Sequence, residues 1–197
     1  DLITISQYLQ AEGLRYVIES NRRRTWENCG SIIWQLNEPW PNVACTNLIE
    51  YYGTPKLAYY FVRDAYRNIA PSLKYVSLYY QAGQTFKAVI YVLNDGSEKT
   101  GKVISILRDD SSRALMYQEY STTLNANTAT YIGPISFQII DKVRQSFTVE
   151  VIVDVGRRQE KSIYLFLVQD KQTGLLSKQA VLRYVSWYKS EMIGIQD

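Results

Sequence analysis

The 197-residue chain contains no histidine and only two cysteines. The absence of histidine excludes Ser-His-Asp and Cys-His nucleophiles and every zinc site that uses an imidazole ligand. Two cysteines are also too few for an all-thiolate zinc site, which takes four. We therefore expect neither a metal nor a cofactor, so any catalysis has to rest on carboxylates, tyrosines, lysines or a bound substrate.

Long apolar runs and a large excess of charge are missing as well. No apolar run approaches the roughly 20 residues of a membrane span. The net charge of +3 is too small to indicate a nucleic-acid partner. No leader of the signal-peptide type is present, but the chain begins with Asp1 rather than Met. The compartment therefore stays open, with periplasmic and extracellular locations among the alternatives.

The two cysteines, Cys29 and Cys45, are compatible either with a disulfide or with two buried thiols.

The first third of the chain has the pattern of an α/β unit. Apolar residues at helical spacing predict a helix over Leu2–Arg24. The run Gly30–Leu36 is almost continuously apolar, as is typical of a parallel strand buried on both faces. A second helix is indicated by Thr54 as its N-cap and Pro55 at its first position. Since a single parallel strand has no partner here, this stretch predicts a fragment of an α/β fold.

From Pro71 onward the pattern changes to short stretches of alternating apolar and polar residues. Turn signals such as Asn94–Gly96, Asp109–Ser112 and Gly133–Pro134 separate them. About seven or eight strands at this spacing predict a mainly β fold, an immunoglobulin-like antiparallel β-sandwich, with a closed barrel as the alternative. The predicted strands are Lys74–Tyr80, Thr85–Leu93, Gly101–Arg108, Tyr117–Leu124, Ile135–Ile140, Ser146–Val155, Lys161–Gln169 and Leu176–Tyr184.

The residues with the clearest chemistry follow the expected buried strand. They are Trp34, Asn37, Glu38 and Trp40, at the carboxyl end of that strand, where α/β barrels bind their substrates. Flat aromatic rings beside amide and carboxylate groups suit a sugar, because the rings stack on its C–H face while the polar groups bond its hydroxyls. The alternative is that both tryptophans only pack the strand end against the following domain.

A family resemblance rests on these residues. The motif Trp-Gln-Leu-Asn-acid-x-Trp-Pro, followed by Tyr-Tyr-Gly-x-Pro-Lys-x-Ala-Tyr-Tyr, resembles the last strand and helix of the catalytic barrel in glycoside hydrolase family 2. The β-mannosidase branch is the most similar, with β-galactosidases and β-glucuronidases as relatives. In that family an immunoglobulin-like sandwich follows the barrel. The resemblance therefore implies a C-terminal (β/α)8-barrel fragment over residues 1–70 and a sandwich over residues 71–197.

The resemblance allows two placements of Glu38, because Trp-x-x-Asn-Glu also resembles the fourth barrel strand, where the Glu is the general acid/base. The chain then passes through one helix into a sandwich, with no room for four more β/α units. We therefore assign Glu38 to the eighth strand, although an Asp is more usual there. The resemblance then implies that Trp34 is a wall of the subsite for the cleaved sugar. Asn37, Glu38 and Trp40 are further substrate-binding residues at that rim.

The catalytic residues of the family would lie outside this chain. Family 2 enzymes are retaining, and their two Glu residues stand about 5–5.5 Å apart across the scissile bond. By resemblance, both are encoded before Asp1, so no catalytic residue is assigned here. A complete barrel takes about 250 residues, and residues 1–70 are too few to contain one.

The resulting hypothesis is the C-terminal part of a retaining glycoside hydrolase that acts on terminal β-linked sugars and is inactive as this chain alone. The alternatives are a non-catalytic β-sandwich module that binds carbohydrate or another protein, and a structural immunoglobulin-like domain. Ile32, Ile33 and Leu36 lose their barrel neighbours in such a fragment. We therefore expect the chain to self-associate through them.

Overall fold

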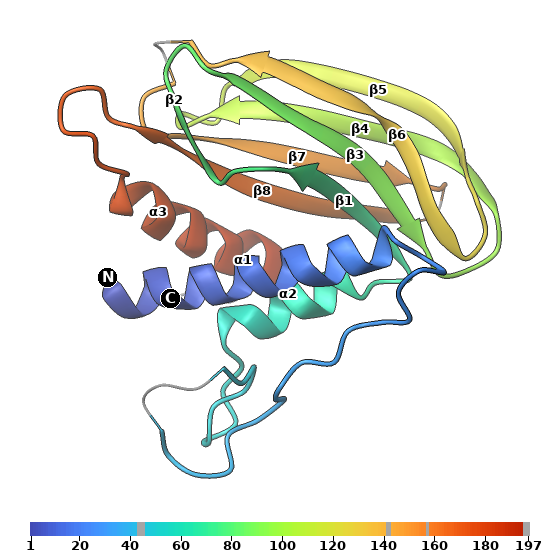
Figure 1. Cartoon of the computed structure of the whole chain (residues 1–197), viewed down its shortest axis with the longest axis horizontal. Helices are drawn as coiled ribbons and strands as arrows, with labels where there is room; N and C mark the ends of the chain where they lie inside the picture. Colours follow the sequence, from blue (N-terminus) through green and yellow to red (C-terminus); the bar gives the residue numbers. More distant parts are fainter. Residues whose placement is uncertain (43–45, 141–142, 157, 195–197) are drawn as a thin grey trace. The chain divides into compact units, whose positions relative to one another are not determined.

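A computed structural model describes residues 1–42, 46–140, 143–156 and 158–194 (Figure 1). Contacts divide the chain into two compact units, one of Asp1–Arg67 with Val185–Asp197 and one of Asn68–Tyr184. The sequence-based boundary between residues 70 and 71 falls inside the first strand of the second unit. The segment after Tyr184 groups with the first unit rather than with the strands.

Helices α1 (Leu2–Arg22) and α2 (Leu57–Ala65) pack against each other in the first unit. The predicted first helix is confirmed and ends two residues early, at Arg22 rather than Arg24. The N-cap of α2 is Lys56, not Thr54, and no side chain caps this helix. The apolar residues buried in these two helices are Tyr8, Ala11, Ile18, Leu57, Ala58, Phe61, Val62 and Ala65.

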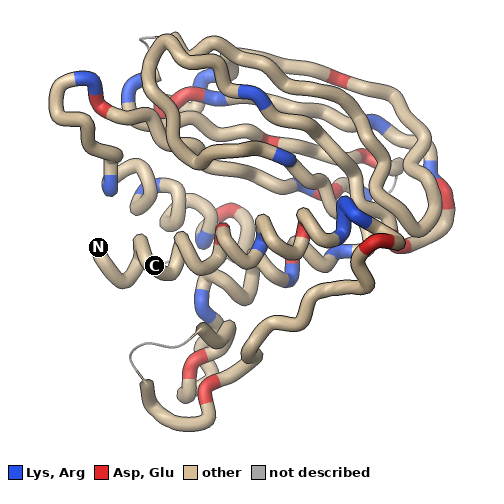
Figure 2. The backbone as a smooth tube through the Cα atoms, in the orientation of Figure 1, with Lys and Arg blue, Asp and Glu red and all other residues tan. Residues whose placement is uncertain are grey.

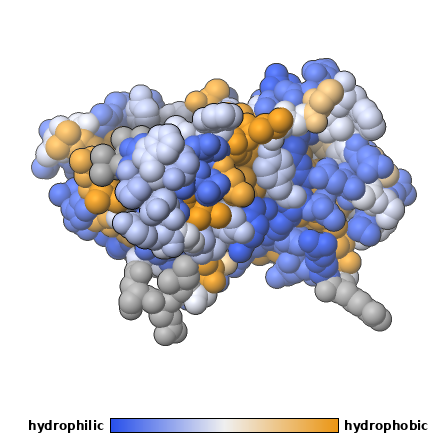
Figure 3. All heavy atoms as spheres, turned by 90° about the horizontal axis from the view of Figure 1, so that it is seen from below, coloured by the Kyte–Doolittle hydropathy of each residue, from blue (hydrophilic) through white to orange (hydrophobic). Residues whose placement is uncertain are grey.

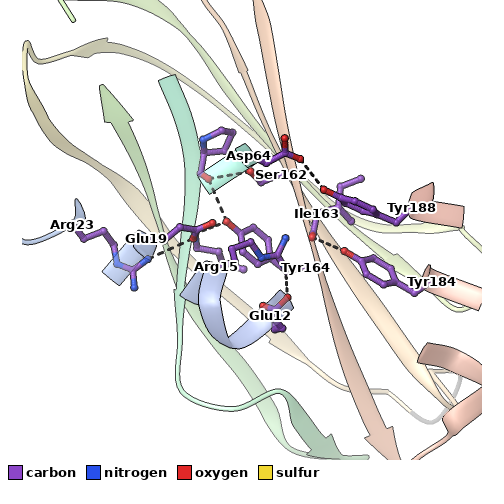
Figure 4. A network of polar contacts seen from close by, with 12 residues as sticks. Glu12, Arg15, Glu19, Arg23, Asp64, Ser162, Ile163, Tyr164, Tyr184 and Tyr188 are labelled. Atoms are coloured by element: carbon purple, nitrogen blue, oxygen red, sulfur yellow. Dashed lines mark hydrogen bonds and ion pairs between the residues drawn. The ribbon is translucent and has the colours of Figure 1, made fainter. Parts of the chain in front are cut away.

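Charged side chains are buried among these apolar ones and are paired. The Arg15 guanidinium lies 4.5 Å from the centre of the Phe61 ring and forms an ion pair with Glu12. The ring of Tyr188 also packs against Phe61, with a distance of 4.7 Å between the two ring centres. Its hydroxyl donates a hydrogen bond of 2.7 Å to the Asp64 carboxylate (Figure 4). Pairing of this kind offsets the cost of removing charge from water.

The predicted buried strand Gly30–Leu36 is wrong. The described residues of this segment form no strand, and their apolar side chains face solvent: Ile32 is 99% exposed, Trp34 80% and Leu36 56%. The physical reason is that a strand needs a neighbour to complete its backbone hydrogen bonds. Within the described part of the first unit no strand supplies one.

The predicted β-sandwich is confirmed in the second unit, as two sheets. The first has the order β1-β3-β6 and the second the order β2-β8-β7-β4-β5. All neighbouring strands are antiparallel except β2, which pairs with β8 in parallel, so the all-antiparallel prediction is wrong for this short strand. The strands are β1 (Ile69–Tyr75), β2 (Tyr79–Gln81), β3 (Thr85–Asn94), β4 (Lys99–Asp109), β5 (Ala114–Leu124), β6 (Thr128–Gln138), β7 (Ser146–Asp154) and β8 (Gln159–Gln169).

Aromatic rings from both sheets form the centre of the sandwich. The ring centre of Phe86, on β3, lies 5.2 Å from that of Phe147 on β7 and 4.7 Å from that of Phe166 on β8. The buried Tyr164 hydroxyl, on β8, accepts a hydrogen bond of 3.1 Å from the backbone N–H of Leu73 on β1. Burial alternates along β3 in one sheet and along β4 and β7 in the other, so each sheet turns one face inward, as expected of a sandwich.

Three predicted strands differ from the structure. Ile135–Ile140 is replaced by the longer β6, which begins at Thr128 and ends at Gln138, so the turn predicted at Gly133–Pro134 is wrong. Lys74–Tyr80 is divided between β1 and β2. Leu176–Tyr184 is wrong, because this region forms helix α3 (Lys178–Tyr188), followed by the π-helical turn η1 (Lys189–Ile193). The residues that α3 buries are spaced three or four apart on one helical face, namely Ala180, Val181, Tyr184, Val185 and Tyr188.

Positive and negative residues are interspersed along the backbone of both units (Figure 2). No helix in the described residues is long and apolar enough to cross a membrane.

Gly101 of β4 stands where any side chain would collide with backbone. A Cβ at this position would lie 2.3 Å from the Asp154 carbonyl oxygen and 2.9 Å from Cγ1 of Val155. We expect Gly101→Ala to lower the free energy of unfolding of the sandwich by about 1–3 kcal/mol. Gly96→Ala is the matched control, since a Cβ there would meet only Oδ1 of Asn94, at 3.5 Å. Urea unfolding followed by circular dichroism measures both, and equal effects would contradict the close approach.

Candidate functional site

The four residues predicted to bind sugar lie between α1 and α2 and differ in exposure. Trp34 is 80% exposed and Trp40 63%, and Asn37 is exposed too. Glu38 is only 5% exposed. Three of these side chains are therefore available to a ligand, and one is turned into the protein. The peptide bond between Trp34 and Gln35 is cis.

Residues 46–49 hold this segment in place through hydrogen bonds. The backbone N–H of Ile49 donates to the Leu36 carbonyl at 2.8 Å, and the N–H of Glu38 donates to the Ile49 carbonyl at 3.0 Å. The hydroxyl of Thr46 donates to the Trp34 carbonyl at 2.8 Å. These contacts hold residues 34–38 beside the residues that directly precede the second part of the motif.

Glu38 is bound by a fully buried amide. Nδ2 of Asn47 donates hydrogen bonds to the Glu38 carboxylate and, at 3.0 Å, to the Ile49 carbonyl. Oδ1 of the same amide accepts a hydrogen bond from the ammonium group of Lys56. Asn47 thus links a buried carboxylate to a cation through its amide, which satisfies groups that would otherwise be costly to bury.

Tyr66, at the end of α2, anchors the start of the segment. Its hydroxyl donates a hydrogen bond of 2.5 Å to the Ser31 carbonyl. Partial burial raises the pKa of Tyr66 above its ordinary value, and the hydrogen bond to Ser31 and the charge of Arg22 oppose this only in part. The hydroxyl therefore keeps its proton at neutral pH and remains a donor.

A shallow hollow of about 380 Å³ is lined in part by the two residues that follow Trp40 in the sequence. Two tyrosines form part of its wall, with ring centres 5.1 Å apart and ring planes at 80°. They are 48% and 80% exposed, and an exposed carboxylate precedes them. The residues that line the hollow are Pro41, Asn42, Glu50, Tyr51 and Tyr52.

Sequence reasoning did not single out Glu50, Tyr51 and Tyr52 as site residues, although the two tyrosines begin the second part of the motif and Glu50 directly precedes it. The available signal was an acid followed by two tyrosines and a turn glycine, Gly53. The two tyrosine rings can stack on the C–H face of a sugar, and the carboxylate of Glu50 can accept hydrogen bonds from its hydroxyls. Neither Trp34 nor Trp40 is among the described residues that line the hollow.

Among the described residues, no group of three or more Cys, Asp or Glu side chains could hold a metal. Cys29 is exposed, so the prediction of a buried thiol at this position is wrong. Cys45, and with it the predicted pairing of the two cysteines, lies outside the described residues.

Comparison with known proteins gives matches among solved structures alone: no family model matches the chain, and no curated protein sequence does. A β-D-mannosidase from Dictyoglomus thermophilum aligns with a TM-score of 0.67 and 25% identity over 82% of this chain. An exo-chitosanase from Amycolatopsis orientalis aligns with a TM-score of 0.59 and 17% identity over 81% of this chain.

These similarities relate the fold of the chain to that of glycoside hydrolases. The chain spans about a fifth of the length of these structures, 19% of the mannosidase and 18% of the chitosanase. It is thus a glycoside-hydrolase-related module.

Asn47→Ala should destabilise the first unit, because it leaves the buried Glu38 carboxylate without its amide donor. We expect a loss of about 2–3 kcal/mol in the free energy of unfolding. Asn37→Ala is the matched control, since the Asn37 side chain is exposed, and it should change stability by less than about 0.5 kcal/mol.

Tryptophan fluorescence during urea unfolding is the appropriate measurement. All four tryptophans, Trp26, Trp34, Trp40 and Trp187, belong to the first unit. Equal stability of the two variants would contradict the structural role of Asn47.

Proposed function

We propose that this chain is the C-terminal part of a retaining glycoside hydrolase of family 2 that acts on terminal β-linked sugars, like a β-mannosidase or β-galactosidase. The alignment with the mannosidase carries the proposal, because it extends over 82% of this chain, more than either unit alone contains. A shared sandwich alone would not account for an alignment of that length.

In this proposal the first unit supplies the last part of a (β/α)8 barrel. The order of helix α1, the apolar segment Gly30–Leu36 and helix α2 is that of a helix, a strand and a helix. The apolar side chains of that segment face solvent, as expected for a barrel strand whose neighbours belong to another part of the protein. The second unit is the immunoglobulin-like sandwich that follows the barrel in the family.

The exposed rings give this unit its role in the reaction. Trp34 would form the wall on which the C–H face of the cleaved sugar stacks, with Trp40 and Asn37 beside it. Glu38 would act as a positioning residue, because its carboxylate is bound to Asn47 and shapes the backbone that carries both tryptophans. The two carboxylates of double displacement, about 5–5.5 Å apart, would come from the remainder of the barrel.

The chain alone should therefore release no nitrophenol from aryl β-mannosides or β-galactosides above the buffer rate. A longer protein that contains this sequence and a complete barrel should hydrolyse one of them. In that protein we expect Trp34→Ala to lower kcat/KM by about 10–100-fold, the effect of removing one stacking wall. Trp26→Ala is the control, since Trp26 is similarly exposed, at 84%, but lies outside residues 34–40, which carry the predicted sugar-binding side chains.

Turnover by the chain alone would contradict the proposal, as would equal activity of the two tryptophan variants. The alternative, a non-catalytic sandwich that binds carbohydrate, predicts saturable binding of neutral oligosaccharides by the chain that Trp34→Ala leaves unchanged. Calorimetric titration distinguishes the two.

The exposed apolar side chains of Gly30–Leu36 should also drive self-association. Apolar side chains lie in patches at the surface (orange in Figure 3). Ile32 and Leu36 are 99% and 56% exposed. We expect the chain to form dimers or larger species at high concentration, and the double variant Ile32→Asp/Leu36→Asp to shift it to monomers.

Sedimentation equilibrium measures this effect. Val76→Asp is the control, because Val76 is 92% exposed but lies in the other unit. A monomeric parent chain at high concentration, or an equal effect of the control, would contradict the expectation.

A further inference from the structure

A polar basin of about 520 Å³ lies on the second unit, and none of the predicted sugar-binding residues lines it. Three segments that are distant in sequence meet there: the turn between β4 and β5, the residues before β7, and helix α3. The charged and amide residues of its wall are Asp109, Asp110, Arg113, Arg144, Gln145 and Arg183. Three arginines thus face two aspartates in one hollow.

One of the two aspartates is already neutralised. Nε and Nη2 of Arg113 donate to Oδ2 of Asp109 at 3.1 and 2.8 Å, and the backbone N–H groups of Ser111 and Arg113 donate to Oδ1 at 3.0 and 2.9 Å. Burial opposes ionisation of Asp109, but these hydrogen bonds outweigh it and lower its pKa. The carboxylate is therefore charged and fully engaged, and it fixes an Arg113 side chain that is itself 59% exposed.

The other side of the basin offers donors in excess of acceptors. Oε1 of Gln145 accepts hydrogen bonds from Nη2 of Arg183 at 2.8 Å and from the Ser177 hydroxyl at 3.2 Å. Its carbonyl is thus engaged and holds the Arg183 guanidinium in place. Arg144 is exposed and forms no ion pair with any residue that the structure describes. Among the described residues that line the basin, three arginines outnumber two aspartates, so their summed formal charge is positive.

We propose that this basin is a binding site for an oxyanion, a carboxylate or sulfate group, held chiefly by Arg144 and Arg183. Guanidinium groups present planar pairs of N–H donors that match the oxygens of such anions. None of the described residues that line the basin is aromatic, so they offer no surface on which nucleic-acid bases could stack. The group is either a free anion or the acid of a uronate sugar.

This proposal does not depend on hydrolase activity, and its test uses binding alone. The whole chain is titrated, at constant ionic strength, with sodium sulfate, with oligogalacturonate and with neutral manno-oligosaccharide, and chemical shifts or heats are recorded. We expect the two anions to bind and the neutral sugar to leave the basin unaffected. Arg144→Ala and Arg183→Ala should each weaken anion binding by about 10-fold.

Arg158→Ala is the matched control. It removes the same side chain and the same charge, but Arg158 lies beyond the other end of β7, beside Glu160. The affinity of the Arg158→Ala variant for the anions should equal that of the parent chain. Arg144→Lys keeps the charge without the planar fork, and we expect it to bind more weakly than the parent.

The outcomes separate the sources of the anion. Tighter binding of oligogalacturonate than of sulfate supports an acidic saccharide, and the reverse supports a free anion. Absence of binding by both anions overturns the proposal. Equal losses in Arg144→Ala and Arg158→Ala also overturn it, because they would show attraction by overall charge only.

Discussion

The structure depends on one requirement, that every strand find a neighbour for its backbone N–H and C=O groups. In the second unit the requirement is met, since each strand pairs within one of two sheets and the sheets cover each other through Phe86, Phe147 and Phe166. In the first unit Gly30–Leu36 has the composition of a buried strand, but the described residues provide no strand beside it. Gly30–Leu36 therefore forms no regular secondary structure, and most of its apolar side chains are exposed.

Much of the local order in the first unit compensates for that missing neighbour. Hydrogen bonds from Ile49 and Thr46 hold one end of the segment, and the Tyr66 hydroxyl holds the other. The buried amide of Asn47 joins the Glu38 carboxylate to Lys56, so that the turn carrying both tryptophans is fixed from inside. The segment that carries both tryptophans can therefore keep a defined shape although no strand lies beside it, as the proposed sugar site requires.

The sequence was sufficient where the pattern is local and periodic. Alternation over Thr85–Leu93 predicted β3, and helical spacing predicted α1. It was insufficient over Leu176–Tyr184, where adjacent apolar residues fit either period, and the structure has a helix. The parallel pairing of β2 and the inward turn of Glu38 depend on partners elsewhere in the chain. No periodic signal marks Asn47 as the partner of that carboxylate.

The central claim is that Gly30–Leu36 is a strand sequence without a sheet, and amide hydrogen exchange tests it most directly. The amides of Ile32 to Leu36 donate no hydrogen bond to any residue that the structure describes. At a concentration where the chain is monomeric, they should exchange at nearly unprotected rates, while those of β7 are strongly protected. Protection of Ile32 to Leu36 equal to that of β7 would contradict the account.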